Sequence, residues 1–244
     1  MNLKKMLTVG TAAFCATVGF GLESANVVGF NGTTLAADTY YMVAVQFDAV
    51  AGNGAGTAIK DLVKGDLPYG MEMQIQKADG TYDIYKYIAE AYDEVADDFV
   101  PGWGDVGDNL ATRLLAPGTV FWLKAPSATE VTIAGAILAD ASKEFTVAAG
   151  KYSMIGNPYP AAANPNALTW TGLTYKDELQ VLKADGTYNI YKYIEEAYDE
   201  IADDFIPGWG DVGDNYVTTG VIPVGQGAWI KPAAEVTVSF ASPL

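Results

Sequence analysis

Histidine is absent from this sequence, and the single cysteine, Cys15, lies near its amino terminus. Without histidine, the chain cannot use serine–histidine or cysteine–histidine nucleophile pairs, histidine general bases or the usual zinc and copper ligand sets. One cysteine cannot form a disulfide within the chain, and 244 residues are enough to bury a core without one. Carboxylate-pair hydrolysis requires one buried carboxyl group, whereas the acidic residues here crowd onto a solvated face. The sequence therefore predicts no catalytic residue and no enzyme.

Basic side chains are also scarce. The chain has 14 lysines and arginines against 30 aspartates and glutamates, which gives a formal net charge of −16. Nucleic acids and anionic membrane surfaces both require a basic face, so neither is expected as a partner. Because copies of such an acidic chain repel one another, we expect any self-association to depend on salt, divalent cations or backbone pairing.

The first 21 residues have the pattern of a secretory signal. Lys4 and Lys5 form a basic start, and residues 6–21 are an uncharged apolar run that is too short to span a bilayer comfortably. We expect cleavage after Gly21 and export to the medium or the cell surface. The mature chain would then contain no cysteine and no membrane span.

A duplication organises the rest of the chain. Residues 77–109 read KADGTYDIYKYIAEAYDEVADDFVPGWGDVGDN, and residues 183–215 read KADGTYNIYKYIEEAYDEIADDFIPGWGDVGDN. The copies differ at four paired positions, which are Asp83/Asn189, Ala89/Glu195, Val95/Ile201 and Val100/Ile206. Flanking residues recur in the same order with a drifting spacing, for example Tyr40 with Tyr152 and Trp122 with Trp229. Repeats of this kind indicate tandem structural units, here residues 22–138 and 139–244.

Short β-branched and aromatic runs alternate with turn signals along both units. This pattern predicts an all-β fold with minor α content, built as two tandem homologous β-sandwich-like units. Asp79-Gly80 predicts a tight turn that opens the duplicated block, and Asn31-Gly32 predicts another turn near the start of the mature chain.

The hydrophobic period changes inside the duplicated block. Ile88, Tyr92, Val95 and Phe99 recur at i, i+4, i+7 and i+11, while acidic residues occupy the other side. This spacing predicts a short acidic helix or loop in each unit, which Pro101 would end.

Three phrases carry a resemblance to a known group of proteins. GKYSMIGNPYP at residues 150–160 resembles a motif of secreted bacterial β-sandwich repeat proteins, SANVVGF at 24–30 resembles the start of exported proteins built from such repeats, and GQGAWIKP at 225–232 resembles their closing strand. The first unit departs from the motif, since Val45, Gln46 and Phe47 stand where the second has Asn157, Pro158 and Tyr159. The resemblance implies an exported surface or structural β-protein and carries over no catalytic residue.

Two oxygen-rich stretches are candidate calcium sites, because calcium takes oxygen ligands on flexible loops. The candidate ligands are Asp97, Asp98, Asp105, Asp108 and Asn109 in the first unit and Asp203, Asp204, Asp211, Asp214 and Asn215 in the second. Their spacing matches no EF-hand. The alternative interpretation, an acidic face followed by a polar turn, stays open.

A repeated set of aromatic residues is the candidate surface for a ligand or a partner. It consists of Tyr85, Tyr87 and Trp103 in the first unit and Tyr191, Tyr193 and Trp209 in the second. In a strand, alternate side chains share a face, so one aromatic face would be core and the other free for sugar rings or a partner subunit.

The two ends of the mature chain hold the candidate assembly strands. Their residues are Val27, Val28 and Phe30 at the start and Val236, Val238 and Phe240 at the end. Each strand lacks a neighbouring unit on one side and is therefore a candidate open edge. The two strands could close on each other within one molecule, or strand addition between molecules could build a head-to-tail polymer.

Together these patterns favour an exported, non-enzymatic structural protein. We expect it to self-assemble into a cell-surface or extracellular filament or layer through its terminal strands. The alternative is a glycan-binding or adhesion module that uses the repeated aromatic surface with the help of calcium. Calcium is the one candidate cofactor, and the candidate partners are other copies of this chain and an extracellular glycan.

Overall fold

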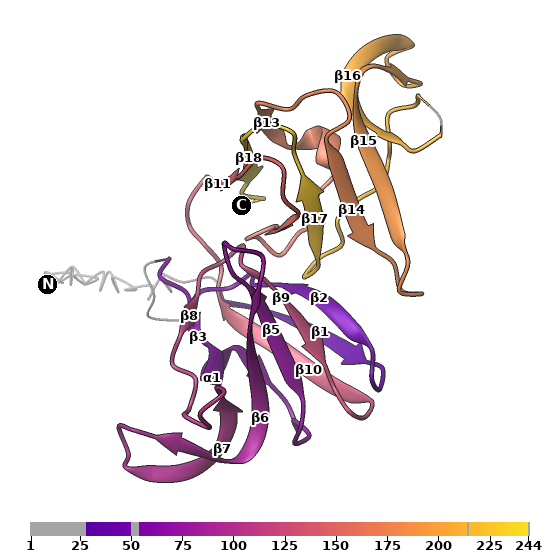
Figure 1. The fold of residues 1–244 in the computed structure, drawn as a ribbon. Coiled ribbons are helices and arrows are strands. Elements are labelled where there is room, and N and C mark those ends of the chain that lie inside the picture. Colours follow the sequence, from indigo (N-terminus) through magenta and orange to yellow (C-terminus); the bar gives the residue numbers. More distant parts are fainter. Residues whose placement is uncertain (1–27, 50–53, 214, 244) are drawn as a thin grey trace, which may run out of the picture.

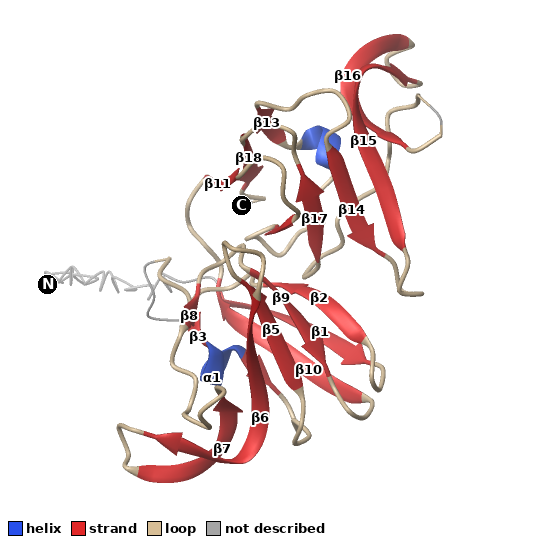
Figure 2. Cartoon of the chain, in the orientation of Figure 1, coloured by secondary structure: helices blue, strands red, loops and turns tan. Residues whose placement is uncertain are grey.

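The computed structural model describes residues 28–49, 54–213 and 215–243. Strands make up 54% of it and helices 3%, so the prediction of an all-β fold is confirmed. Figure 1 and Figure 2 show that each half of the chain folds into its own group of strands. In the described ranges, no helix combines the length and the apolar character needed to cross a membrane. The predicted signal, residues 1–21, lies outside these ranges.

The first half forms a five-stranded antiparallel sheet in the order β2-β9-β5-β6-β7 and a three-stranded sheet in the order β1-β10-β4. The larger sheet contains β2 (Tyr40–Ala44), β5 (Glu72–Gln76), β6 (Tyr82–Asp93), β7 (Asp98–Gly104) and β9 (Val120–Lys124). The smaller sheet contains β1 (Val28–Leu35), β4 (Val63–Lys64) and β10 (Thr129–Ala136). A short pair, β3 (Thr57–Ala58) with β8 (Leu114–Leu115), and helix α1 (Ile59–Leu62) complete this half.

The second half repeats this plan with sheet orders β12-β17-β14-β15-β16 and β11-β18-β13. The larger sheet contains β12 (Ser153–Gly156), β14 (Glu178–Leu182), β15 (Tyr188–Asp199), β16 (Asp204–Asp211) and β17 (Gly227–Lys231). The smaller sheet contains β11 (Ser142–Val147), β13 (Thr169–Thr171) and β18 (Val236–Ala241). A 3-10 turn, η1 (Pro165–Ala167), precedes β13.

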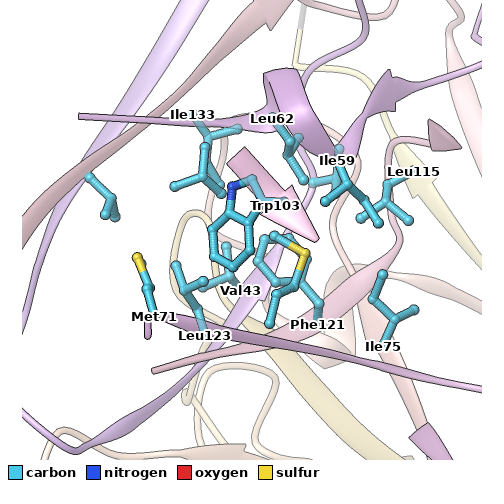
Figure 3. Packing of buried hydrophobic residues seen from close by; sticks show 14 of the residues in the cluster. Val43, Ile59, Leu62, Met71, Ile75, Trp103, Leu115, Phe121, Leu123 and Ile133 are labelled. Carbon is cyan, nitrogen blue, oxygen red and sulfur yellow. The ribbon is translucent and has the colours of Figure 1, made fainter. Parts of the chain in front are cut away.

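Each half buries its own core between its two sheets. In β5 the side chains of Met73 and Ile75 are buried while their neighbours are partly exposed, which is the alternation expected of a strand with one buried face. Figure 3 shows Trp103 at the centre of the first core, surrounded by apolar side chains from both sheets and from α1. Trp209 belongs to the separate cluster of the second half.

Of the two alternatives predicted for the acidic stretch, a short helix or a loop, the helix is wrong. The chain instead continues as β6, turns and returns as β7, and β15 and β16 do the same in the second half. The pairing register shifts by one residue between Ile88 and Ala91, which breaks the alternation of the strand and produces a spacing that resembles a helix. Tyr92 and Phe99, which the helical pattern places on one stripe, face each other across the hairpin with ring centroids 5.3 Å apart.

One of the two predicted turns is confirmed and the other is wrong. Gly80 adopts a φ of +88° between β5 and β6, and the Asp79 carboxylate accepts a hydrogen bond from the Thr81 amide. By contrast, β1 runs straight through Asn31 and Gly32, because every residue of this strand pairs with β10. Long-range pairing here overrides a local turn preference.

The predicted open edge at the end of the chain is also wrong. β18 lies between β11 and β13 and is therefore paired on both sides. Its predicted joint residues, Val236, Val238 and Phe240, are all buried. The reason is that β11 and β13, from the same half of the chain, pair with the two edges of β18 and leave neither edge for another molecule.

The strand at the other end is different. β1 pairs with β10 on one side and ends the order of its sheet, so the described residues supply no strand for its second edge. The Phe30 side chain is 78% exposed. Val27 and the side chain of Val28 lie outside the described part of the chain.

Candidate functional site

Half of the residues of the predicted aromatic surface are buried in the hydrophobic cores. Trp103 and Trp209 are each 1% exposed, and Tyr191 is 3% exposed. The other three members, Tyr85, Tyr87 and Tyr193, are partly buried against the same clusters. The two tryptophans and Tyr191 therefore belong to the cores of the two halves and form no exposed aromatic platform.

The candidate calcium ligands serve mainly as turn formers. The Asp105 carboxylate accepts hydrogen bonds from the Gly107 and Asn109 amides at 2.8 and 3.0 Å. Asp97 and its counterpart Asp203 adopt positive φ in the hairpin turns, and each accepts a hydrogen bond from a tyrosine hydroxyl. Such local bonds explain why aspartate is preferred in turns.

The other candidate ligands that the structure describes also have local roles. Asp98 and Asp204 each accept a hydrogen bond from the amide of the following phenylalanine, and Asp108 adopts a positive φ of 58°. Asp211 pairs with β15, the Asn215 carbonyl accepts from the Tyr198 amide, and Asp214 lies outside the described residues. Where the chain is described, no three acidic, histidine or cysteine side chains gather into a group that could hold a metal ion.

Two hairpins made from the duplicated stretch are the first candidate interaction surface. We call residues 82–104 the first arm and residues 188–211 the second arm. Their turn residues Val95 and Ile201 are 91% and 95% exposed, and Phe99 and Phe205 are 61% exposed. Figure 1 shows the two arms at opposite ends of the molecule, with β7 at the bottom and β16 at the top.

The turn at the end of each arm is a defined structure. In the first arm, the Asp93 carboxylate accepts hydrogen bonds from the Val95 and Ala96 amides at 2.9 and 3.3 Å. Asp199 makes the equivalent bonds in the second arm. Both arms therefore present an apolar side chain in the same setting, between acidic neighbours.

The seam between the two halves is the second candidate surface. There β2 and β9 lie against β12 and β17, and Met42, Ala44 and Val120 form a small buried cluster. Close approach is possible because Gly156 and Gly227 have no side chain: a Cβ atom at Gly156 would lie 2.6 Å from the Ala44 Cβ.

A row of six side chains crosses this seam, and we call it the aromatic ladder. In order, it contains Lys124, Tyr40, Trp122, Trp229, Tyr152 and Lys231. Successive ring centroids are 6.2, 6.3 and 6.2 Å apart, and the two lysine Nζ atoms lie 5.4 and 5.0 Å from the outer tyrosine rings. The order reads the same from both ends, as expected of an approximately two-fold contact.

The sequence shows that these residues recur, but it does not show that the two copies lie next to each other in the fold. Tyr40 recurs as Tyr152 and Trp122 as Trp229, which marks them as equivalent positions. Only the packing of one half on the other brings the two pairs into one row.

Each outer tyrosine of the ladder is held by a carboxylate and an amide. The Tyr40 hydroxyl donates to Glu72 at 2.8 Å and accepts from the Gln74 amide at 3.1 Å. In the second half, the Tyr152 hydroxyl donates to Glu178 at 2.5 Å, and the Gln180 amide donates to that hydroxyl at 3.2 Å.

These bonds shift the pKa values of both partners in the second half. The hydrogen bond to Glu178, with burial and the charge of that carboxylate, raises the pKa of Tyr152 to about 12. Burial alone would raise the pKa of Glu178, but hydrogen bonds from Lys192, Tyr152 and Gln180 and the charge of Lys192 outweigh it and lower this pKa to about 2. Glu178 is therefore ionised and Tyr152 neutral at pH 7.

The depressed pKa of Glu178 predicts an acid-sensitive stability. Because the folded-state pKa of about 2 lies below the ordinary value of 4.5, the stabilisation is fully present above pH 4.5 and is lost as the pH falls towards 2. We expect the Glu178→Gln variant to lack this part of the acid-induced loss, on the order of 1–3 kcal/mol. Urea unfolding at constant ionic strength from pH 7 to pH 2.5 measures it.

Glu72→Gln is the matched control for this experiment. Glu72 occupies the equivalent position, and its pKa is also lowered, but the ion pair that Lys192 makes with Glu178 is found only in the second half of the described chain. We expect its acid dependence to be weaker. Identical pH profiles for the wild type and Glu178→Gln would contradict the prediction.

No protein-family model matches the sequence, and no curated protein or solved structure compared with it is significantly similar. The function of the chain is therefore inferred from its own geometry.

Proposed function

We propose that this chain is a non-enzymatic, exported structural protein and one subunit of a cell-surface or extracellular assembly. The observation that carries the proposal is the pair of arms, each of which holds a large apolar side chain in solvent at its tip. Exposed apolar patches often mark contact sites between proteins. Two equivalent contact sites at opposite ends allow one copy to join two neighbours.

The most deeply buried carboxylates support a structural role. The Asp48 carboxylate accepts hydrogen bonds from the Gly54 and Gly56 amides at 2.6 and 2.8 Å. The Asp177 carboxylate accepts from the Thr174 and Ala233 amides at 2.8 and 2.7 Å. Both carboxylates accept hydrogen bonds from the backbone of neighbouring loops on each of their oxygens, and both side chains are buried, which is the arrangement of a group that holds loops in place.

The arms replace the terminal strands as the proposed joints. β18 is paired on both sides, whereas the tip residues Val95 and Ile201 are 91% and 95% exposed. The tip residues are flanked by carboxylates such as Glu94 and Asp97. Neighbouring copies should therefore associate more readily when salt or a divalent cation screens this repulsion.

A charge placed at the tips tests this proposal. We expect the mature chain, residues 22–244, to form filaments, sheets or oligomers in the presence of salt or millimolar calcium, as seen by light scattering and negative-stain electron microscopy. Val95→Asp or Ile201→Asp alone should shorten the assemblies, because one joint remains. The double variant should stay monomeric, because a carboxylate cannot be buried in an apolar contact without a large desolvation cost.

Phe30→Asp on β1 is the matched control. It introduces the same charge at an exposed apolar side chain of the remaining open edge. Assembly that survives Phe30→Asp and fails in the double arm variant supports the arms as joints. A wild-type chain that stays monomeric under all these conditions, or assemblies that depend on Phe30 alone, would refute them.

A further inference from the structure

A groove lies beside the aromatic ladder on the Tyr40 side of the seam. One hollow, with a volume of 560 Å³, is lined by residues of both halves, among them Tyr40, Gln74, Trp122 and Tyr188. A second hollow of 550 Å³ continues along the seam. Thr39, Tyr40, Leu182 and Gly186 line both hollows, so the two adjoin, and we call them together the groove.

The two sides of the seam differ beside the outer tyrosines of the ladder. Next to Tyr152, the Gln76 amide donates a hydrogen bond to the Tyr152 carbonyl at 3.1 Å and ties the end of β5 to the other half. The equivalent position at the end of β14 is Leu182, which has no hydrogen-bonding side chain. The turn that follows Leu182 is therefore not tied to Tyr40, and Leu182 becomes part of the groove wall.

The chemistry of the walls identifies the class of ligand. Partly exposed aromatic rings of Tyr40, Trp122 and Tyr188 offer apolar surface. The Gln74 side-chain nitrogen and the Tyr40 hydroxyl bond each other and Glu72, which leaves the Gln74 side-chain oxygen and the Tyr188 hydroxyl as neutral polar groups of the wall. The Asp38 carboxylate at the rim is paired with Lys124 at 3.3 Å. The net charge of −16 disfavours an anionic ligand.

We propose that this groove binds a neutral glycan chain. A hexose ring has an apolar face that suits an aromatic side chain, and hydroxyl groups around its edge that suit amides and tyrosine hydroxyls. Two adjoining hollows of 550 and 560 Å³ have room for several linked sugar units. The tips of the arms, with Val95 and Ile201, do not line the groove; of the arm residues, Tyr188 and Asn189 at the base of the second arm do. The glycan proposal can therefore be tested separately from the proposed assembly through the arm tips.

Binding can be tested with neutral hexasaccharides. The mature chain is titrated with cellohexaose, laminarihexaose, mannohexaose and chitohexaose, up to about 5 mM so that affinities near 1 mM are detected. Isothermal calorimetry and tryptophan fluorescence report binding, since Trp122 lines the groove. We expect at least one hexasaccharide to bind, and Trp122→Ala to weaken its binding by about tenfold.

The approximate symmetry of the ladder supplies the matched control. Trp229→Ala removes the equivalent ring from the ladder without touching the groove wall, and we expect binding to stay within about twofold of the wild type. Leu182→Gln introduces at the groove the glutamine that the equivalent position, Gln76, has on the other side of the seam, where it bonds the Tyr152 carbonyl. This variant should also weaken binding of the hexasaccharide. If the tryptophan variants do not fold, Gln74→Ala and Gln180→Ala provide the same comparison.

Three results would overturn the proposal. The first is no signal with any of the four hexasaccharides. The second is an equal loss of binding in Trp122→Ala and Trp229→Ala when both are folded by circular dichroism. The third is binding of an extended peptide at this groove while every hexasaccharide fails, which would assign the groove to a protein partner.

Discussion

Replacing Trp209 with alanine should lower the free energy of unfolding by about 3–5 kcal/mol, the usual range for removing a buried aromatic side chain. Trp209 is 1% exposed and lies 5.3 Å from the ring of Trp170 and 5.8 Å from that of Tyr193. Its loss leaves a cavity that these rings cannot fill without moving. Urea unfolding followed by circular dichroism measures the change, and we expect a similar loss for Trp103→Ala.

Two further substitutions separate core packing from other effects. Trp209→Phe should cost less than Trp209→Ala, because the phenyl ring fills much of the space and the indole Nε1, which is buried without a hydrogen-bond partner in the described protein, is removed. Phe205→Ala in the same hairpin should change stability by less than about 0.5 kcal/mol, since this side chain is 61% exposed. A loss at Phe205 as large as that at Trp209 would contradict the assignment of Trp209 to the core.

Replacing Gly156 with valine should disrupt the seam between the halves. A Cβ atom at this position would lie 2.6 Å from the Ala44 Cβ and 2.7 Å from the Val120 Cγ2, which is closer than nonbonded carbon atoms approach. Overpacking of this kind costs about 1–3 kcal/mol where the structure can adjust. Here the simplest adjustment is separation of the halves, so we expect lower stability together with a larger radius of gyration in small-angle X-ray scattering. Gly227→Val, which would approach Val120 to 2.4 Å, should behave in the same way.

Gly32→Val is the control for the seam variants. Gly32 also lies in a strand, its φ is not positive, and a Cβ atom there would meet nothing closer than 3.9 Å. This substitution should leave both stability and the radius of gyration close to wild-type values. If Gly156→Val also leaves the stability and the radius of gyration unchanged, the two halves do not pack as closely as the structure places them.

The duplicated stretch illustrates how a correct pattern can lead to a wrong element. The repeat itself and the turn at Gly80 are evident from the sequence, and both are present in the fold. The spacing of Ile88, Tyr92 and Phe99 nevertheless suggests a helix, because one extra residue in β6 shifts the alternation halfway along the strand. A period read over few residues cannot separate a helix from a strand that contains a bulge.

The aromatic residues show the same limit for the candidate site. Strand alternation indicates that one face of β6 is core, but it does not say which aromatic residues stay exposed. Trp103 and Trp209 are buried in the cores, whereas Trp122 and Trp229 are partly exposed and meet at the seam. The sequence shows these two tryptophans only as equivalent positions of the repeat.

By itself, the sequence determined the all-β class, the duplication, the tight turn at Gly80 and the exclusion of histidine chemistry and of a disulfide within the chain. These features depend on residue types and on neighbours a few positions apart, where φ preferences and side-chain alternation act. Only the tertiary structure decided that β18 is paired on both sides, that the arms extend to opposite ends and that the two tryptophans meet at the seam. Those outcomes depend on contacts between residues far apart in the chain. Such contacts form where an apolar face or a strand edge meets a complementary surface, and local conformational preferences do not specify which surfaces meet.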